Sequence, residues 1–211
     1  MARIFEGLGV TLKISMISVL LSVLLGVPSG LLMSSKIRFC RLFFKLYLEF
    51  IRIMPILVLL FLFYYSLSSV FSINLPAMAV AILVFTLWGT AEMADLVRGA
   101  VTSLPKHQWE SSRAIGLTEP QLNIYVIVPQ AIRRLLPGVI NLTTRMIKTT
   151  PFVFFINIPD LVKVAQQIVE VTGMKNLLAS VWVYGLIFFI YFAICYPISL
   201  FSHYLEKVWQ D

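Results

Sequence analysis

Residues 14–33 read ISMISVLLSVLLGVPSGLLM, a run of twenty residues without a charged side chain. The hydrocarbon core of a bilayer is roughly 30 Å thick, and a helix needs about 20 apolar residues to cross it. Three more stretches, residues 53–71, 76–97 and 178–201, are similarly long and apolar. Each of the four stretches is therefore predicted to form a transmembrane helix.

The composition of the whole chain also indicates a membrane protein. Of its 211 residues, 59% are hydrophobic and 13% are charged, whereas soluble domains are roughly 45–50% apolar and about 25% charged. A globule of this size cannot bury so many apolar side chains, so lipid must cover part of the surface. In such a chain the net charge of +7 reflects topology and contact with anionic membrane lipid, and we expect no nucleic-acid partner.

A fifth candidate span, residues 135–155, is more polar than the other four. A span with this many polar groups should face other helices or water, and a soluble loop is the alternative. The apolar flanks favour a span. We therefore expect an all-α membrane protein, a single domain of residues 1–211 with five transmembrane helices. The polar residues of this candidate are Asn141, Thr143, Thr144, Arg145, Lys148, Thr149 and Thr150.

The distribution of basic residues predicts the orientation. If the loop after the first span is cytoplasmic, 11 of the 17 Lys and Arg residues lie on the cytoplasmic side and four lie outside. An excess of Lys and Arg marks cytoplasmic loops. The N-terminus is therefore expected outside and the C-terminus in the cytoplasm.

Two segments outside the spans show helical patterns. Residues 36–50 mix basic and aromatic side chains, which is typical of an amphipathic helix lying along the membrane interface. A short elbow between spans is the alternative. After the fourth span, Asn157 is expected to cap a helix that has Pro159 and Asp160 in its first turn.

The longest cytoplasmic connection, residues 98–134, has strong local signals. Pro105 can begin a helix, and Gly116 can end it in a left-handed turn. Residues 118–121, Thr-Glu-Pro-Gln, form a capping box for a second helix, which Pro129 is expected to interrupt. We expect a rigid helix–turn–helix knob at the membrane surface.

This loop resembles the cytoplasmic motif of ABC importer permeases, in which Glu-Ala-Ala is followed at fixed spacing by Gly and then Ile-x-Leu-Pro. The residues that match or closely substitute for the motif are Glu110, Ser111, Ser112, Gly116, Val126, Val128 and Pro129. Residues 98–110, 52–55 and 158–161 are similar to the polar-amino-acid branch of that family. The chain departs from this branch at Ile53-Met54, at residues 149–151 and at Glu92, positions in or near the spans.

The resemblance implies a subunit of an ATP-driven importer in the bacterial inner membrane. The short helix would dock on a separate ATP-binding subunit, with Glu110, Ser111, Ser112, Ala114, Gly116 and Pro129 as the coupling residues. It also implies two copies of that ATPase, a periplasmic or extracellular amino acid binding protein, and a second permease subunit that is the same chain or a relative.

Sequence motifs for catalysis are missing from the chain. It has no Gly-x-x-x-x-Gly-Lys loop, and no Gly-Lys pair occurs anywhere. The two histidines, His107 and His203, are far apart in sequence. We therefore expect a transport subunit rather than an enzyme, with no cofactor and no metal site.

Ionisable side chains at membrane depth are candidates for the substrate path, because they are costly to place there. Arg145 and Lys148 lie three residues apart and could attract a carboxylate, or they could pair with acids of the third span. Glu92 and Asp160 could hold a cationic group, while the alternative for Asp160 is an acid that stabilises a helix start. Tyr65 could line the path, although aromatic residues in a span are more often packing residues.

The function expected from these features is import of polar or charged amino acids by alternating access. One alternative keeps the ATP-driven mechanism and changes the cargo to methionine or another small solute. Another is a channel or carrier that works without ATP, and a third is a membrane scaffold without transport.

Overall fold

The computed structural model describes residues 2–34, 38–71, 74–173 and 178–210, and all regular structure in these ranges is helical. Lys36 and Lys175, which enter the charge distribution above, lie outside the described residues. The helices are α1 (Ala2–Ser34), α2 (Arg38–Ile53), α3 (Ile56–Phe61), η1 (Leu62–Ser66), α4 (Leu67–Phe71), α5 (Ala77–Thr102), α6 (His107–Ala114), α7 (Glu119–Leu122), η2 (Asn123–Ile127), α8 (Val128–Thr149), η3 (Thr150–Ile156), α9 (Leu161–Gly173) and α10 (Ala179–Gln210).

Three helices, α1, α5 and α10, are each long and apolar enough to cross a membrane. Two bent pairs raise the number of candidate crossings to as many as five, if each pair counts as one span. One pair joins α2 to the segment Ile56–Ser66, and the other joins Glu119–Ile156 to α9. The described part of the chain is thus an all-helical bundle with three to five candidate spans, and the number five remains a prediction.

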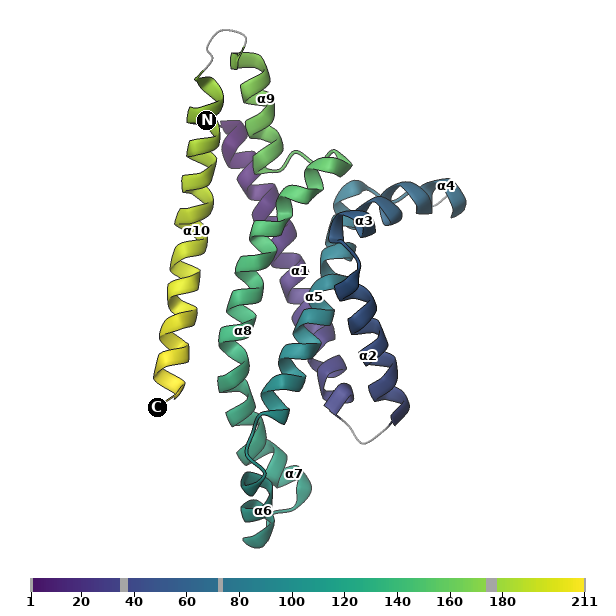
Figure 1. Cartoon of the computed structure of the whole chain (residues 1–211), viewed down its shortest axis with the longest axis vertical. Coiled ribbons are helices and arrows are strands. Elements are labelled where there is room, and N and C mark those ends of the chain that lie inside the picture. Colours follow the sequence, from purple (N-terminus) through teal and green to yellow (C-terminus); the bar gives the residue numbers. More distant parts are fainter. Residues whose placement is uncertain (1, 35–37, 72–73, 174–177, 211) are drawn as a thin grey trace.

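The second predicted span, residues 53–71, is helical from Ile56 to Phe71, where α3, η1 and α4 follow one another without a gap, but it begins at a sharp bend. The chain bends by 98° between α2 and α3. Pro55 has no N–H to donate to the preceding turn, and it disfavours helical conformation at Met54. Its ψ of 129° is extended, and α3 starts at the next residue. In Figure 1, α3 and α4 consequently project from the bundle instead of continuing along it.

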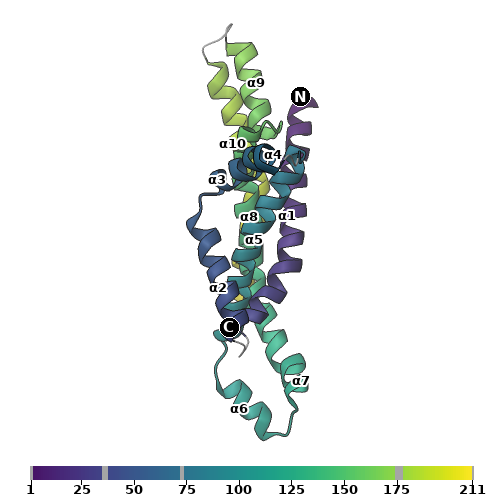
Figure 2. The same cartoon turned by 90° about the vertical axis from the view of Figure 1, so that its right-hand side faces the viewer.

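The segment over residues 36–50, predicted to be an amphipathic interfacial helix or an elbow, is helical from Arg38 onward. Its helix, α2, runs beside α1 and α5 in both views (Figures 1 and 2). Leu48 and Ile51 are buried in this contact. The Tyr47 hydroxyl donates a hydrogen bond of 2.6 Å to the Leu87 carbonyl of α5. One face of α2 is therefore a bundle surface.

Small side chains allow α1 and α5 to approach closely. Gly26 and Gly30 of α1 face Met93 and Ala94 of α5, where a Cβ on either glycine would lie about 2.5 Å from the nearest atom. The Ser22 hydroxyl of α1 donates to the Thr86 carbonyl of α5 at 3.3 Å. Small residues and hydroxyls at such contacts are typical of helix pairs in membranes, where burial of apolar groups does not by itself bring helices together.

Gly30→Ala tests this close contact. The new Cβ would lie 2.5 Å from the Ala94 carbonyl oxygen and 2.6 Å from Cβ of Val97. Overpacking of this kind costs about 1–3 kcal/mol, and we expect the melting temperature in detergent to fall by about 5 °C. Gly9→Ala on the same helix is the matched control, because no atom lies within 4 Å of its Cβ position. Equal melting temperatures for the two variants would contradict the proposed packing.

The helix through Pro129 is not interrupted, contrary to the prediction. The helices α7, η2 and α8 follow one another without a gap, and Pro129 lies in the first turn of α8. The missing proline N–H removes one helical hydrogen bond, and the wider turn of η2, a π-helix, directly precedes it. Pro129 therefore perturbs the helix locally without ending it.

The two ends of the chain lie at opposite ends of the bundle (Figure 1). The N-terminus of α1 is near α9 at one end. The C-terminus of α10 is near the other end, from which α6 and α7 project. The loop that carries the predicted coupling motif and the C-terminus therefore share one end of the bundle.

Candidate functional site

The loop between α5 and α8 folds as a knob with a hydrophobic core of its own. Leu104, Leu122 and Ile127 are buried together, and Trp109 and Leu117 pack against them. The knob, defined here as residues 104–127, therefore has an interior that resists deformation. A knob with such an interior can transmit a displacement instead of absorbing it.

A tight glycine turn joins α6 to α7 within the knob. Gly116 has a φ of +85°, a region that side chains rarely adopt, and its N–H donates to the Arg113 carbonyl at 3.0 Å. After the turn, the predicted capping box is present, with the Thr118 N–H donating to the Gln121 side chain at 3.0 Å. An ion pair between Arg113 and Glu119, at 2.7 Å, spans the turn.

One hydrogen bond attaches the knob to α8, and two more join α8 to Ser103 at the end of α5, where the knob begins. Arg134 of α8 donates to the Ser103 carbonyl at 2.6 Å and to the Ser103 hydroxyl at 2.9 Å. The Gln130 side chain donates to that of Gln108 at 3.1 Å. The C-terminal end of α5, the knob and the start of α8 are therefore mechanically connected.

The exposed part of the knob includes most of the predicted coupling residues. Glu110, Ser111, Ala114 and Gly116 are exposed, as is Pro129 at the start of α8. Ser112 differs, because it is buried and its hydroxyl donates to the Gln108 carbonyl at 2.6 Å. Ser112 thus stabilises α6 from inside and cannot be part of a contact surface.

Three exposed large apolar side chains of the knob, Ile115, Ile124 and Tyr125, were not among the predicted coupling residues. Ile115 is 77% exposed and Tyr125 is 71% exposed. Exposed apolar side chains on a polar knob mark a surface that a partner can cover. Their exposure depends on how α6 and η2 pack, so no sequence pattern identifies them in advance.

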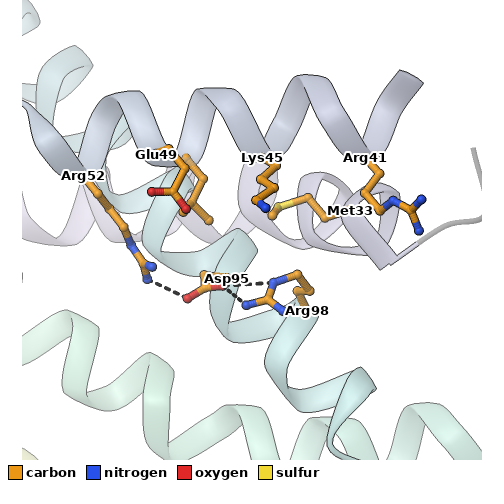
Figure 3. A pocket seen from close by; sticks show the side chains of 8 residues that line it. Met33, Arg41, Lys45, Glu49, Arg52, Asp95 and Arg98 are labelled. Carbon is orange, nitrogen blue, oxygen red and sulfur yellow. Dashed lines mark hydrogen bonds and ion pairs between the residues drawn. The ribbon is translucent and has the colours of Figure 1, made fainter. Parts of the chain in front are cut away.

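A second group of functional candidates forms a network of charged side chains across three helices. Glu92 of α5 pairs with Arg145 of α8 and lies 3.6 Å from Arg52 of α2. Arg52 also pairs with Asp95 at 2.6 Å, and Asp95 pairs with Arg98 at 2.5 Å. Figure 3 shows Asp95 between the two arginines. The network joins α2, α5 and α8 through two half-buried carboxylates.

The two basic candidates of the fourth span are separated by the structure. Arg145 points to α5, where it pairs with Glu92 and lies 5.6 Å from the centre of the Trp88 ring. Lys148 points to α10 and lines a cavity of about 400 Å³ with Tyr191 and Cys195. The two side chains meet different helices because α8 packs between α5 and α10, with Arg145 directed to the first and Lys148 to the second.

Tyr65 and Asp160 lie outside the charged network. Tyr65 is half exposed on η1, and its hydroxyl donates to the Phe155 carbonyl at 3.4 Å. Asp160 is fully buried, and its carboxylate accepts hydrogen bonds from the N–H groups of Val162 at 3.2 Å and Lys163 at 2.9 Å. Asp160 is therefore the residue that caps α9.

Asn157, which was predicted to cap α9, has a different place. It ends η3 in a left-handed conformation with a φ of 66°, which asparagine tolerates better than most residues. Its side chain accepts a hydrogen bond from the Lys163 ammonium at 2.7 Å. Asp160 caps α9 in place of Asn157, because the turn at Asn157 leaves residues 158–160 outside any helix and α9 begins at Leu161.

Burial gives Asp160 a pH dependence that can be measured. Desolvation raises the pKa of its carboxyl to about 6, although the backbone hydrogen bonds act in the opposite direction. The folded state then favours the protonated form, so the group's contribution to stability is present below pH about 4 and is lost as the pH rises to about 6. We expect the melting temperature of the wild type, relative to Asp160→Asn, to fall over this window and to be constant above it. A difference that does not change with pH would contradict the burial.

Among the described residues, no three His, Cys, Asp or Glu side chains come together as metal ligands would. Glu92 and Asp95, both partly buried, form ion pairs with three arginines of the described residues. The knob lies at one end of the bundle. The class of protein defined by these features is a polytopic helical membrane protein with a folded knob at one end of its bundle.

The chain belongs to the family of binding-protein-dependent transport system inner membrane components, whose model matches residues 22–208. It is 33% identical to the probable amino-acid ABC transporter permease protein YckA of Bacillus subtilis, over 97% of this chain and 88% of that protein. It is 32% identical to the L-cystine transport system permease protein TcyB of the same organism, over 95% of this chain and 84% of that protein. These relatives are transport components of the membrane and not enzymes.

Solved structures agree with this assignment. The crystal structure of an amino acid ABC transporter with histidines has a chain 30% identical to this one, with a TM-score of 0.85 over 96% of this chain and 94% of that chain. An inward-facing structure of the MetNI methionine ABC transporter matches with a TM-score of 0.75 and 19% identity, over 99% and 97% of the two chains. The second likeness shows the shared fold alone.

Proposed function

We propose that this chain is the membrane subunit of an ATP-driven importer for polar or charged amino acids. The observation that carries the proposal is the knob, which has its own core, a fixed turn at Gly116 and a hydrogen bond to α8, and which begins where α8 is also bonded to the end of α5. Closure of an ATP-bound partner would push the knob, and the push would reach α5 and α8 because they are attached to it. Alternating access is a two-state equilibrium that such a push can bias.

The proposed cargo rests on relatives and on charge. One relative is named for L-cystine, and another, 29% identical over 98% of this chain, is named a probable glutamine permease. Both compounds carry an ammonium and a carboxylate group. The pair formed by Glu92 and Arg145 has both complementary charges, and the Arg145 side chain is half exposed. If the substrate's ammonium binds Glu92 and its carboxylate binds Arg145, each charge of the pair exchanges one partner of opposite sign for another.

The proposed assembly contains two ATP-binding subunits, a binding protein outside the membrane and a second permease subunit. The segment formed by α3, η1 and α4 supports the second permease. It projects from the bundle (Figure 1) and exposes the apolar side chains of Val58, Phe61, Leu62 and Val70. A second subunit packed against this segment would cover these groups and help to enclose a path that one chain does not enclose.

The proposed orientation places the knob and the C-terminus in the cytoplasm and the N-terminus outside. The knob must reach a soluble ATPase, and the C-terminus of α10 lies at the same end of the bundle as the knob. The N-terminus lies at the opposite end, as an odd number of spans requires.

Affinity purification of the tagged chain from native membranes tests the coupling proposal. We expect an ATP-binding subunit to co-purify in mild detergent, and mass spectrometry will identify it together with any second permease. The double variant Glu110→Ala/Ile115→Ser should reduce the recovered ATPase by about tenfold, because it removes an exposed charge and an exposed apolar contact of the knob.

Lys207→Gln is the matched control for this experiment, because Lys207 is exposed near the same end of the bundle but outside the knob. It should leave ATPase recovery unchanged. Absence of any ATPase from the wild-type preparation would favour a channel or carrier that works without ATP. Unchanged recovery with the double variant would refute docking through the knob.

A further inference from the structure

A cavity between α1, α2 and α5 is lined mainly by charged side chains. Its volume is about 330 Å³, and Met33 and Leu48 form its apolar part. The side chains of Arg41, Lys45, Glu49 and Arg52 extend from α2 on the same side, toward Asp95 and Arg98 of α5 (Figure 3). Spacings of three and four residues along α2 account for this shared face.

The charges around the cavity do not balance. Four cationic side chains face two carboxylates, which leaves an excess of two positive charges. Asp95 is already paired with both Arg52 and Arg98. In the part of the chain that the structure describes, Arg41 and Lys45 have no ion pair. The cavity therefore presents two cations that are available to an external anion.

An exposed apolar stripe lies next to this charged face on the same helix. Its side chains are between 57% and 79% exposed, which is unusual for so many large apolar groups on one helix unless lipid or a partner covers them. Helix α2 thus has three faces: the charged face, the exposed apolar stripe beside it, and the face with the buried residues Leu48 and Ile51. The stripe consists of Phe39, Leu42, Phe43, Leu46, Phe50 and Ile53.

The cavity lies toward the end of the bundle that carries the knob. Met33 is near the C-terminal end of α1, Arg41 is in the first turn of α2, and Arg98 is near the C-terminal end of α5. In Figure 1 these helix ends point toward α6 and α7. A ligand at this level would therefore reach the cavity from the leaflet on the knob side.

We propose that this cavity binds the headgroup of an anionic phospholipid, whose acyl chains lie along the apolar stripe of α2. The phosphate meets Arg41 and Lys45, and the chains cover the aromatic and aliphatic side chains beside them. Basic clusters at the membrane surface attract anionic lipids, and a zwitterionic lipid gains less because its own cation opposes the site. The inference depends on neither the cargo nor the ATPase of the proposed importer.

The site ties α2 to α5 through the network that also contains Glu92. Arg52 belongs to both, because it lines the cavity and contacts Glu92 and Asp95. A phosphate held by Arg41 and Lys45 of α2 would also attract Arg98 of α5, which lines the same cavity. The lipid would therefore stabilise α2 against α5.

The test is a lipid titration of the full-length chain, purified in mild detergent with its co-purifying subunits and observed by native mass spectrometry. Phosphatidylglycerol and phosphatidylcholine of the same chain length are the two probes. We expect the wild type to bind phosphatidylglycerol at least about twenty-five-fold more tightly than phosphatidylcholine. Arg41→Gln/Lys45→Gln should weaken phosphatidylglycerol binding by about twenty-five-fold and leave phosphatidylcholine unaffected, since each basic group near the surface contributes about fivefold.

Two control variants make the result specific. Arg38→Gln/Lys207→Gln removes the same charge from exposed positions that do not line the cavity, and it should change binding by less than about threefold. Arg41→Lys/Lys45→Arg keeps the charge and should keep binding. Melting temperature in lipid-free detergent shows that each variant is folded.

Several outcomes would overturn the proposal. Equal affinity of the wild type for the two lipids would remove the need for an anionic headgroup. An equal loss in both double glutamine variants would indicate general electrostatics instead of a site. Displacement of phosphatidylglycerol by inorganic phosphate, with the apolar stripe left uncovered, would assign the cavity to a free anion. A second copy of the chain bound in place of lipid would assign the stripe to a protein interface.

Discussion

Gly116→Pro should reduce uptake by about a hundredfold while ATP hydrolysis by the assembled complex continues. Proline fixes φ near −65° and has no N–H, whereas Gly116 has a φ of +85° and donates to the Arg113 carbonyl. The mismatch costs about 3 kcal/mol or more, which leaves about 1% of the native turn. Uptake and ATPase activity in proteoliposomes with the partner subunits would measure the two quantities separately.

The conservative variant Gly116→Asn separates the turn's geometry from the identity of the residue. Asparagine adopts the left-handed region more readily than other residues with side chains, and no atom lies within 4 Å of the Cβ position. We therefore expect Gly116→Asn to keep most of the coupled uptake. Insertion of all three proteins, checked by membrane fractionation, should be equal because the turn lies outside the bundle. Normal coupled uptake by Gly116→Pro would refute the role of the turn.

Glu92→Gln should lower both stability and uptake, because one carboxylate contacts arginines from two other helices. Its side chain is 14% exposed, while the side chains of Arg52 and Arg145 are 40% and 51% exposed. Removal of one partner from a buried pair costs about 3–5 kcal/mol, and water around the arginines reduces this to about 1–3 kcal/mol here. We expect the melting temperature in detergent to fall by about 5 °C.

A double variant tests whether Glu92 and Arg145 interact in the folded protein. Glu92→Gln/Arg145→Gln removes the unpaired guanidinium together with the acid, so part of the lost stability should return. Glu170→Gln, at an exposed acid on α9 outside the charged network, is the control and should have no effect. If the losses from Glu92→Gln and Arg145→Gln simply add, the two side chains do not interact in the folded protein.

If Glu92 and Arg145 also meet the substrate, uptake responds differently from stability. Each single variant should then raise the KM for a zwitterionic amino acid. The rise should be larger than the loss of folded protein, judged from the melting temperature, can explain. The double variant should recover stability but not affinity. Recovery of both together would indicate that the pair has a structural role alone.

Features that depend on neighbouring residues in sequence were predicted well. The apolar runs, the left-handed turn at Gly116 and the capping box at Thr118 are each set within a few residues, because chain geometry and hydrogen bonding act locally there. The all-helical membrane class follows from composition and run length alone. The resemblance to ABC importer permeases likewise rests on spacing along one loop, and the family match confirms it.

Predictions failed where a local signal allowed more than one geometry. The predicted helix over residues 53–71 did not include the bend of 98° at its start, where Pro55 separates α2 from α3. At Pro129 the same kind of signal predicted a break, and a π-helical turn accommodated it instead. A proline removes one hydrogen bond in both cases, and packing decides how far the chain turns.

The sequence by itself determined that the chain is a helical membrane protein of the permease family and where the loop with the permease motif lies. Only the tertiary structure decided which charged residues meet. Arg52 joins Asp95 across 43 positions, and Arg145 joins Glu92 across 53, while Lys148 turns to α10 although it is three residues from Arg145. The physical reason is that helical spacing fixes the direction of a side chain on its own helix, whereas its partner depends on which helix packs there. That packing is set by close contacts such as Gly26 and Gly30 against α5, far along the chain from the charges that they bring together.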